Sequence, residues 1–184
     1  LWTPQPGPQA RAAICPADVT MFGGSHGGGK SDCAAGRQIR GAEKYSNHWN
    51  GLIIRRKYKE LAEMRRRFDE LIANGLPAER TGGDQQTNHI RFSNGGQVSL
   101  VAINDFAGVA DYVGHQFTEV TIDEGTTFPF FYGMVDKLKG SVRSAHGVPC
   151  RMFVTGNPGG PGHNQVKEYF KLGSSQNGLS SMLL

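Results

Sequence analysis

Short apolar runs alternate with longer amphipathic stretches along most of this chain. The runs have the length of strands and are bounded by turn-forming residues, which is typical of buried strands. They predict strands at Val19–Gly23, Gly51–Arg55, His89–Phe92, Gln97–Ile103, Phe117–Ile122 and Cys150–Thr155. The Asn94-Gly95-Gly96 segment separates the third strand from the fourth, so these two strands are expected to form a hairpin.

Helical periodicity occupies the longer intervals between the runs. It is clearest from Lys57 to Asn74, where apolar residues recur at spacings of three and four, namely Leu61, Met64, Phe68, Leu71 and Ile72. Further helices are predicted from Lys30 to about Ser46 and from Pro129 to Ser144. Because strands alternate with helices, we predict an α/β fold with a mostly parallel sheet and helices on both faces.

The 184 residues are enough for one α/β domain, which we place at residues 19–172. Residues 1–18 form an N-terminal arm, and the proline- and glycine-rich Leu1–Pro8 is expected to be extended. Residues 173–184 are expected to be a mobile, unpaired tail or the start of a truncated linker or lid. Because the first residue is Leu1 rather than Met, we expect a fragment or a processed piece.

A glycine-rich loop of the pattern G-x-x-x-x-G-K-[ST] lies between the first predicted strand and the first predicted helix. Backbone N–H groups of such a loop bind phosphate oxygens, and its glycines let the backbone approach the anion. The lysine contacts the β- and γ-phosphates of ATP, and the serine ligates Mg²⁺. A plain glycine-rich turn before Lys-Ser is the alternative. The predicted nucleotide-binding residues are Gly24, Ser25, His26, Gly27, Gly28, Gly29, Lys30 and Ser31.

Two carboxylates, Asp123 and Glu124, follow the strand Phe117–Ile122. Because parallel strands end at one edge of the sheet, both are expected beside the phosphate-binding loop. We assign Asp123 to Mg²⁺, held through its water shell, and Glu124 to polarising the water that attacks the γ-phosphate. A solvated strand end is the alternative. Glu119 and Thr121 make this strand more polar than a central parallel strand usually is.

The last predicted strand leads into Thr155-Gly156-Asn157-Pro158 at the same edge. Asn157 or Thr155 can hydrogen-bond the γ-phosphate or the attacking water there, and we assign Asn157 to this role. Loss of that contact after hydrolysis would shift the following segment. Gly-Asn-Pro-Gly-Gly is also strong turn chemistry, so a simple exit from the strand is the alternative.

Composition limits the class of protein only loosely. The net charge of +4 permits a polyanionic partner without requiring one. The three scattered cysteines favour a reduced cytoplasm, and the spacing of the six histidines predicts no structural metal. No apolar stretch approaches the roughly 20 residues needed to cross a bilayer.

Basic residues are densest between Arg55 and Arg67. Contact with a DNA backbone is one interpretation of this region. The alternative is ordinary helix-surface pairing at i,i+4. It would join Glu63 with Arg67, Arg65 with Asp69, and Arg66 with Glu70.

Three segments together, Gly23–Asp32, Ile122–Glu124 and Thr155–Gly160, resemble the ATPase domain of phage large terminases, the motors that pump DNA into preformed capsids. The resemblance covers about Pro4 to Phe170. It implies a RecA-like P-loop NTPase core that hydrolyses ATP with Mg²⁺. It also implies a homo-oligomeric ring, expected to be a pentamer, whose partners are portal protein, small terminase subunit and double-stranded DNA, with no membrane. The implied location is the host cytoplasm, with transient docking on the procapsid.

The resemblance extends to individual residues outside the three segments. Pro6–Gln9 resembles the family's adenine-recognition segment, which implies that Gln9, or alternatively Gln5, contacts adenine. Many members carry an arginine in the loop where this chain has His26. Some carry a trans-acting arginine finger shortly before the Asp-Glu pair, where this chain has none. Arg143 is our candidate finger, and an exposed helix-end arginine is the alternative.

Two other functions stay open at this point. One is a helicase-like or other RecA-type ATPase, which the absence of a second RecA-like domain and of helicase motifs disfavours. The other is a nucleotide-binding assembly module with little intrinsic activity, which the intact Lys30 and Glu124 disfavour.

Overall fold

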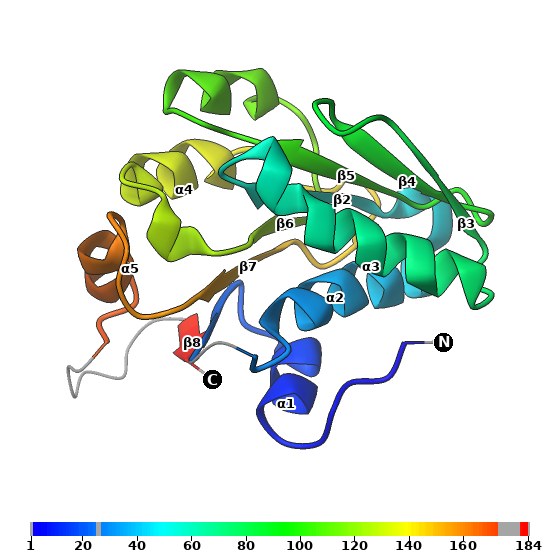
Figure 1. The fold of residues 1–184 in the computed structure, drawn as a ribbon, viewed down its shortest axis with the longest axis horizontal. Coiled ribbons are helices and arrows are strands. Elements are labelled where there is room, and N and C mark those ends of the chain that lie inside the picture. Colours follow the sequence, from blue (N-terminus) through cyan, green and yellow to red (C-terminus); the bar gives the residue numbers. More distant parts are fainter. Residues whose placement is uncertain (1, 25–26, 173–180, 184) are drawn as a thin grey trace.

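The computed structural model describes residues 2–24, 27–172 and 181–183, the last three by their backbone alone. In this part of the chain eight strands form one sheet in the order β3-β4-β5-β2-β6-β7-β1-β8 (Figure 1). The strands are β1 Val19–Gly23, β2 Asn50–Arg55, β3 Ala78–Thr81, β4 Asn88–Phe92, β5 Gln97–Ala102, β6 Glu119–Ile122, β7 Arg151–Gly156 and β8 Ser181–Leu183. The α-helices are α1 Pro8–Ile14, α2 Lys30–Tyr45, α3 Leu61–Ala73, α4 Phe131–Lys139 and α5 His163–Tyr169.

The sheet is mostly parallel, as the alternation of strands and helices predicts. Strands β5, β2, β6, β7, β1 and β8 are mutually parallel. Strands β4 and β5 pair antiparallel, so the predicted hairpin is confirmed, and β3 adds a further antiparallel edge strand.

Helices cover both faces of the sheet. Successive residues of a buried strand point to opposite sides, so each strand contributes to a core on either face. Phe22 and Ile53 belong to the core beneath α1, α2 and α3. Met21 and Leu52, their direct neighbours in sequence, belong to the core beneath α4 and α5. Among the described residues, no helix combines the length and the apolar character that crossing a membrane requires. The mostly parallel sheet with helices on both faces confirms the predicted fold class.

The sequence pattern does not predict α1, β3 or α5, whose seven, four and seven residues are too few for a clear periodicity. The expectation of an extended arm is wrong at its end, where Pro8 occupies the first turn of α1, a position that needs no N–H donor. The helix expected up to Ser144 ends at Lys139, and the helix expected from Lys57 begins at Leu61 after a 3₁₀ turn.

The described residues at the end of the C-terminal tail are paired, so the expectation of an unpaired tail is wrong there. Ser181–Leu183 forms β8, which runs parallel to β1 with Val19 opposite Ser181. Without β8, the backbone groups of β1 on this side would form an open sheet edge. Residues 173–180 lie outside the described residues.

The unusual polarity of β6 is explained by a buried layer between this strand and α2. Arg37 on α2 makes two hydrogen bonds to Glu119, at 3.1 and 2.6 Å, and a third to the carbonyl oxygen of Ala12. Gln38 donates to Thr121 at 3.1 Å and accepts from the Trp49 indole at 3.1 Å. Buried polar groups are tolerated when they are hydrogen-bonded in this way.

Gly51→Ala is expected to destabilise the fold by about 1–3 kcal/mol, because added atoms overpack a filled core. An ideal Cβ on Gly51 would lie only 1.8 Å from Gln38 Oε1. Urea unfolding measures the loss. Gly140→Ala is the matched control, since Gly140 has φ −66° and no atom within 4 Å of its ideal Cβ. Equal stability of the two variants would contradict the crowding at Gly51.

Candidate active site

The carboxyl ends of β1, β6 and β7 lie side by side at one edge of the sheet. Gly23 is opposite Gly156, and Ile122 is opposite Val154. The loop after β1, the Asp-Glu pair after β6 and the turn after β7 therefore begin at the same edge. Open α/β sheets bind their ligands at this edge.

Glycines shape the described part of the phosphate-binding loop. Gly24, Gly27 and Gly29 have φ angles of +139°, +82° and +66°, which residues with side chains rarely adopt. No atom lies within 4 Å of an ideal Cβ on Gly24 or Gly27, so the backbone conformation rather than crowding requires glycine there. Ser25 and His26, which the sequence also assigns to this loop, lie outside the described residues.

Lys30 is the first residue of α2, and it is buried over the loop. Its Nζ lies 3.5 Å from the carbonyl oxygen of Gly24. Burial lowers the pKa of Lys30, and the carboxylates of Asp123 and Glu124 oppose this shift. The side chain adds a positive charge to the positive end of the helix dipole, which is the arrangement that binds anions.

Asp123 is fully buried and accepts hydrogen bonds from three different elements. Its Oδ1 accepts from Ser31 Oγ at 3.3 Å and from Thr155 Oγ1. Its Oδ2 accepts from Arg55 Nε at 2.7 Å. The structure thus brings the two predicted magnesium ligands, Ser31 and Asp123, into direct contact. Hydroxyl and carboxylate oxygens are hard ligands that suit Mg²⁺, so these residues fit the ion.

Glu124 differs from its neighbour in backbone and in exposure. Its φ of 60° and ψ of 48° are left-handed, which is uncommon for a residue with a side chain. Its N–H donates to Thr155 Oγ1 at 3.0 Å, and its carbonyl oxygen accepts from Thr127 Oγ1 at 2.7 Å. Its side chain is 32% exposed, whereas Asp123 is buried. One carboxylate is therefore fixed among donors, and the other can meet a water molecule.

Arg55, the last residue of β2, is a site residue that the sequence interpretation places in a basic surface region. Its guanidinium is 5% exposed and contacts Asp123 Oδ2 through Nε at 2.7 Å and Nη2 at 2.6 Å. Nη2 also donates to Ser31 Oγ at 2.8 Å, and Nη1 lies 3.9 Å from Glu124 Oε2. Burial acts to lower the pKa of Arg55, but Asp123 and Glu124 outweigh it and the pKa is raised.

The register of the sheet explains why Arg55 lies beside Asp123. Ile54 of β2 is opposite Ile122 of β6, so Arg55 and Asp123 follow directly at the same edge. The rule that places Asp123 beside the phosphate-binding loop therefore applies to Arg55 as well.

Gln9 lies against the phosphate-binding loop, on α1. Its Nε2 donates to the carbonyl oxygen of Gly29 at 3.0 Å and to Asp32 at 3.1 Å, and its Oε1 accepts from the N–H of Gln5. A hollow of about 280 Å³ beside it is lined by Gln5, Gln9, Gly28 and Lys30 among others. These contacts place both candidate glutamines near the loop, and the adenine contact stays a prediction.

The two residues expected to respond to hydrolysis lie in different surroundings. Thr155 Oγ1 joins Asp123 to the N–H of Glu124. Asn157 lines a hollow of about 320 Å³ together with Gly24 and Thr126. The structure therefore places Thr155 at the Asp-Glu pair and Asn157 near the loop, and the predicted contact of Asn157 with the γ-phosphate stays a prediction.

Arg143 lies away from the other predicted residues. It is exposed, and its Nη2 donates to the carbonyl oxygen of Gly114 at 2.8 Å. Its N–H donates to the carbonyl oxygen of Phe117 at 3.0 Å, just before β6 begins. This is the amino end of the sheet, opposite the phosphate-binding loop. Arg143 therefore takes no part in the site of its own chain.

The basic region is only partly a helix surface. Arg66 pairs with Glu70 at 2.6 Å, as predicted. The other two predicted pairs are wrong, because their arginines reach across to residues far away in the sequence. Arg65 pairs with Asp84 at 3.1 Å, and Arg67 pairs with Asp32 at 2.6 Å.

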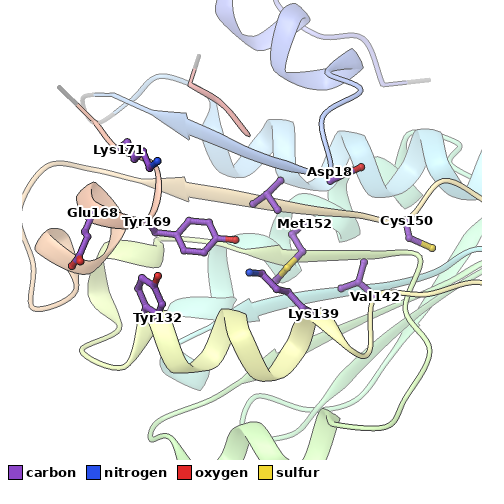
Figure 2. Close-up of a pocket in the computed structure, with 10 residues that line it drawn as sticks. Asp18, Tyr132, Lys139, Val142, Cys150, Met152, Glu168, Tyr169 and Lys171 are labelled. Carbon is purple, nitrogen blue, oxygen red and sulfur yellow. The ribbon is translucent and has the colours of Figure 1, made fainter. Parts of the chain in front are cut away.

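A larger hollow of about 580 Å³ lies elsewhere, between α4, α5 and the start of β1 and β7. Figure 2 shows Lys139, Tyr132 and Tyr169 around it, with Met152 from the sheet. Its lining also includes Asp18 and Val19, at the amino end of β1, whereas the phosphate-binding loop follows the carboxyl end. The larger volume of this hollow therefore does not indicate the predicted site.

No protein-family model matches the chain, and no curated protein sequence matches it. Solved structures do match. The large terminase of a thermophilic bacteriophage, in complex with ADP, superposes with a TM-score of 0.69 at 16% sequence identity, over 96% of this chain. The chain has the RecA-like fold of large terminase ATPase domains. It spans 44% of the length of that terminase.

Two further solved structures share this fold. The large terminase ATPase domain of Thermus phage P74-26 matches with a TM-score of 0.66 at 13% identity, over 100% of this chain and 80% of its own length. The N-terminal domain of the DNA packaging ATPase of bacteriophage phi29 matches with a TM-score of 0.66 at 15% identity, over 96% of this chain and 93% of its own length. The terminase-like fold thus extends over nearly the whole chain.

Proposed function

We propose that this chain is the ATP-hydrolysing motor domain of a phage DNA-packaging machine, which moves double-stranded DNA into a procapsid. The observation that carries the proposal is the convergence of Lys30, Ser31, Asp123 and Glu124 at one edge of a RecA-like sheet. The similarity to terminase and packaging ATPase structures supports a packaging motor over other RecA-type ATPases. ADP in one of those structures supports a nucleotide as the ligand.

Each site residue has a role that its surroundings support. Lys30 and the loop N–H groups bind the phosphates. Ser31 and Asp123 would hold Mg²⁺, which when bound neutralises charge on the phosphate oxygens. Glu124 accepts a proton from the attacking water, and Thr155 fixes the backbone that carries this carboxylate.

The proposed partners follow from the same assignment. The domain would act as a homo-oligomeric ring, expected to be a pentamer, docked on a portal protein in the host cytoplasm. Its other proposed partners are the small terminase subunit and double-stranded DNA. Gln9 would contact adenine, and Asn157 would report the loss of the γ-phosphate to the segment that follows it.

Mg²⁺-dependent ATP hydrolysis, measured with and without double-stranded DNA, tests the proposal, with electron microscopy to detect rings. We expect hydrolysis that DNA stimulates in assembled rings. Rings that bind ATP but hydrolyse it no faster with DNA would contradict a motor and favour an assembly module. Absence of nucleotide binding would contradict the site itself.

Arg143→Ala is expected to lower hydrolysis in assembled rings by about 10³-fold or more, if Arg143 acts on the neighbouring subunit. Its side chain is exposed and donates a hydrogen bond to a backbone carbonyl oxygen. It can therefore extend toward a neighbouring subunit without breaking any ion pair among the described residues. Rings are mixed from Arg143→Ala and Glu124→Gln protomers, each inactive alone. Partial recovery is expected, because some interfaces pair an intact Glu124 with an intact Arg143. No recovery at any ratio in intact rings would exclude this role.

A further inference from the structure

The guanidinium of Arg55 contacts both residues that would ligate a divalent cation. Nη2 lies 2.8 Å from Ser31 Oγ and 2.6 Å from Asp123 Oδ2. Ser31 Oγ in turn donates to Asp123 Oδ1 at 3.3 Å. The three side chains form a closed hydrogen-bonded group in which a positive charge already lies against the cation-binding oxygens.

Two further carboxylates surround the same guanidinium. Glu63 Oε2 lies 3.9 Å from Nη2, and Glu124 Oε2 lies 3.9 Å from Nη1. Glu63 is 65% exposed and Glu124 is 32% exposed, so both can follow a moving partner. Arg55 therefore has two further carboxylates with which it can pair, one near Nη2 and one near Nη1.

A cation bound to Ser31 and Asp123 would lie within a few ångströms of this guanidinium. Like charges at that separation repel strongly where little water screens them, and Arg55 is only 5% exposed. The oxygen lone pairs that accept from Arg55 are also the ones that a hard cation, or a water of its shell, would use. Contact of Arg55 with these oxygens and binding of a divalent cation beside them therefore compete.

We propose that Arg55 competes with Mg²⁺ for Ser31 and Asp123, and that it turns toward Glu63 and Glu124 when the nucleotide-bound cation takes these oxygens. The inference rests on the proposed nucleotide site and adds to it a residue that sets its cation dependence. Arg55 also donates to the carbonyl oxygen of Glu60 at 3.1 Å, directly before α3. Its movement would therefore reach the start of that helix.

Calorimetric titration with ADP at a series of Mg²⁺ concentrations, at about pH 8 where carboxylates are ionised, tests the competition. For Arg55→Gln, the Mg²⁺ concentration needed for half-maximal ADP affinity is expected to fall roughly tenfold, because the competing charge is gone. ADP affinity in the presence of a chelator is expected to fall several-fold, because a cation near the phosphates is lost. If Arg55 were purely structural, its replacement would weaken ADP affinity both with Mg²⁺ and with the chelator.

Two further variants separate charge from folding. Arg55→Lys keeps a positive charge and is expected to keep the wild-type Mg²⁺ dependence within a few-fold. Arg37→Gln breaks a second buried arginine–carboxylate pair, with Glu119 of β6, and is the matched control. It is expected to lose stability without any change in Mg²⁺ dependence.

Glu63→Gln changes only an exposed side chain, so it tests the inference even if Arg55→Gln does not fold. Removing this alternative partner of Arg55 is expected to raise the required Mg²⁺ concentration by about two- to threefold. Unchanged Mg²⁺ dependence in both Arg55→Gln and Glu63→Gln, with ADP still bound, would overturn this inference alone. Failure of the wild-type chain to bind ADP at any Mg²⁺ concentration would overturn the proposed function and this inference with it.

Discussion

Replacing Lys30 with alanine is expected to weaken ATP binding by about 10²-fold or more. The ammonium group is buried over the loop, 3.5 Å from the carbonyl oxygen of Gly24, where it would meet the phosphates with little water between. Truncating one partner of a buried charge pair costs about 2–5 kcal/mol, and each 1.4 kcal/mol is a factor of ten in affinity. The backbone N–H groups of the loop remain, so weak binding persists.

Isothermal calorimetry with ATP and Mg²⁺ measures this loss. Lys44→Ala is the matched control, because Lys44 is an exposed residue at the other end of α2 that lies over the ring of Tyr45. Its removal is expected to leave ATP affinity unchanged. Equal affinities of Lys30→Ala and the wild-type chain would contradict the assignment of the phosphate-binding loop.

Glu124→Gln is expected to keep ATP binding and to lower turnover by at least about 10²-fold. Glutamine has nearly the same size, and the hydrogen bonds described for residue 124 use its backbone N–H and carbonyl oxygen, whereas its side chain lies 3.9 Å from Arg55 Nη1. The amide cannot accept a proton from the attacking water as the carboxylate does. Binding and chemistry should therefore separate in this variant.

Single-turnover hydrolysis, beside ATP affinity from calorimetry, distinguishes the two effects. Glu43→Gln, at an exposed position of α2, makes the same chemical change away from the site and should hydrolyse ATP at the wild-type rate. Near-normal turnover by Glu124→Gln would place the base on another residue. Loss of ATP binding in this variant would point instead to a structural role of the carboxylate.

The best sequence predictions rest on short patterns combined with one rule of sheet topology. The loop pattern places Lys30 and Ser31 at the start of a helix, and α2 begins at Lys30. The end of an apolar run places Asp123 at a strand end, and β6 ends at Ile122. The parallel order of strands then brings both ends to one edge, where Ser31 contacts Asp123.

The predicted helix-surface pairs show where local rules fail. Spacing at i,i+4 allows a pair, but the choice of partner depends on every carboxylate within reach in the folded chain. Arg67 has Asp32 of α2 within reach, and Arg65 has Asp84 of the loop before β4. Because α3 packs against α2 and against β3, which precedes the loop of Asp84, these distant partners prevail over the predicted neighbours.

The α/β alternation, the glycine-rich loop before α2 and the Asp-Glu strand end can be recognised from the sequence alone, because each depends on residues close together in the chain. The folded chain is needed to show that Arg55 lies against Ser31 and Asp123 and that Arg37 neutralises Glu119. These contacts join residues 68 and 82 positions apart. The sequence shows that an arginine carries a positive charge. Its partner depends on strand order and register, which bring distant carboxylates within hydrogen-bonding distance.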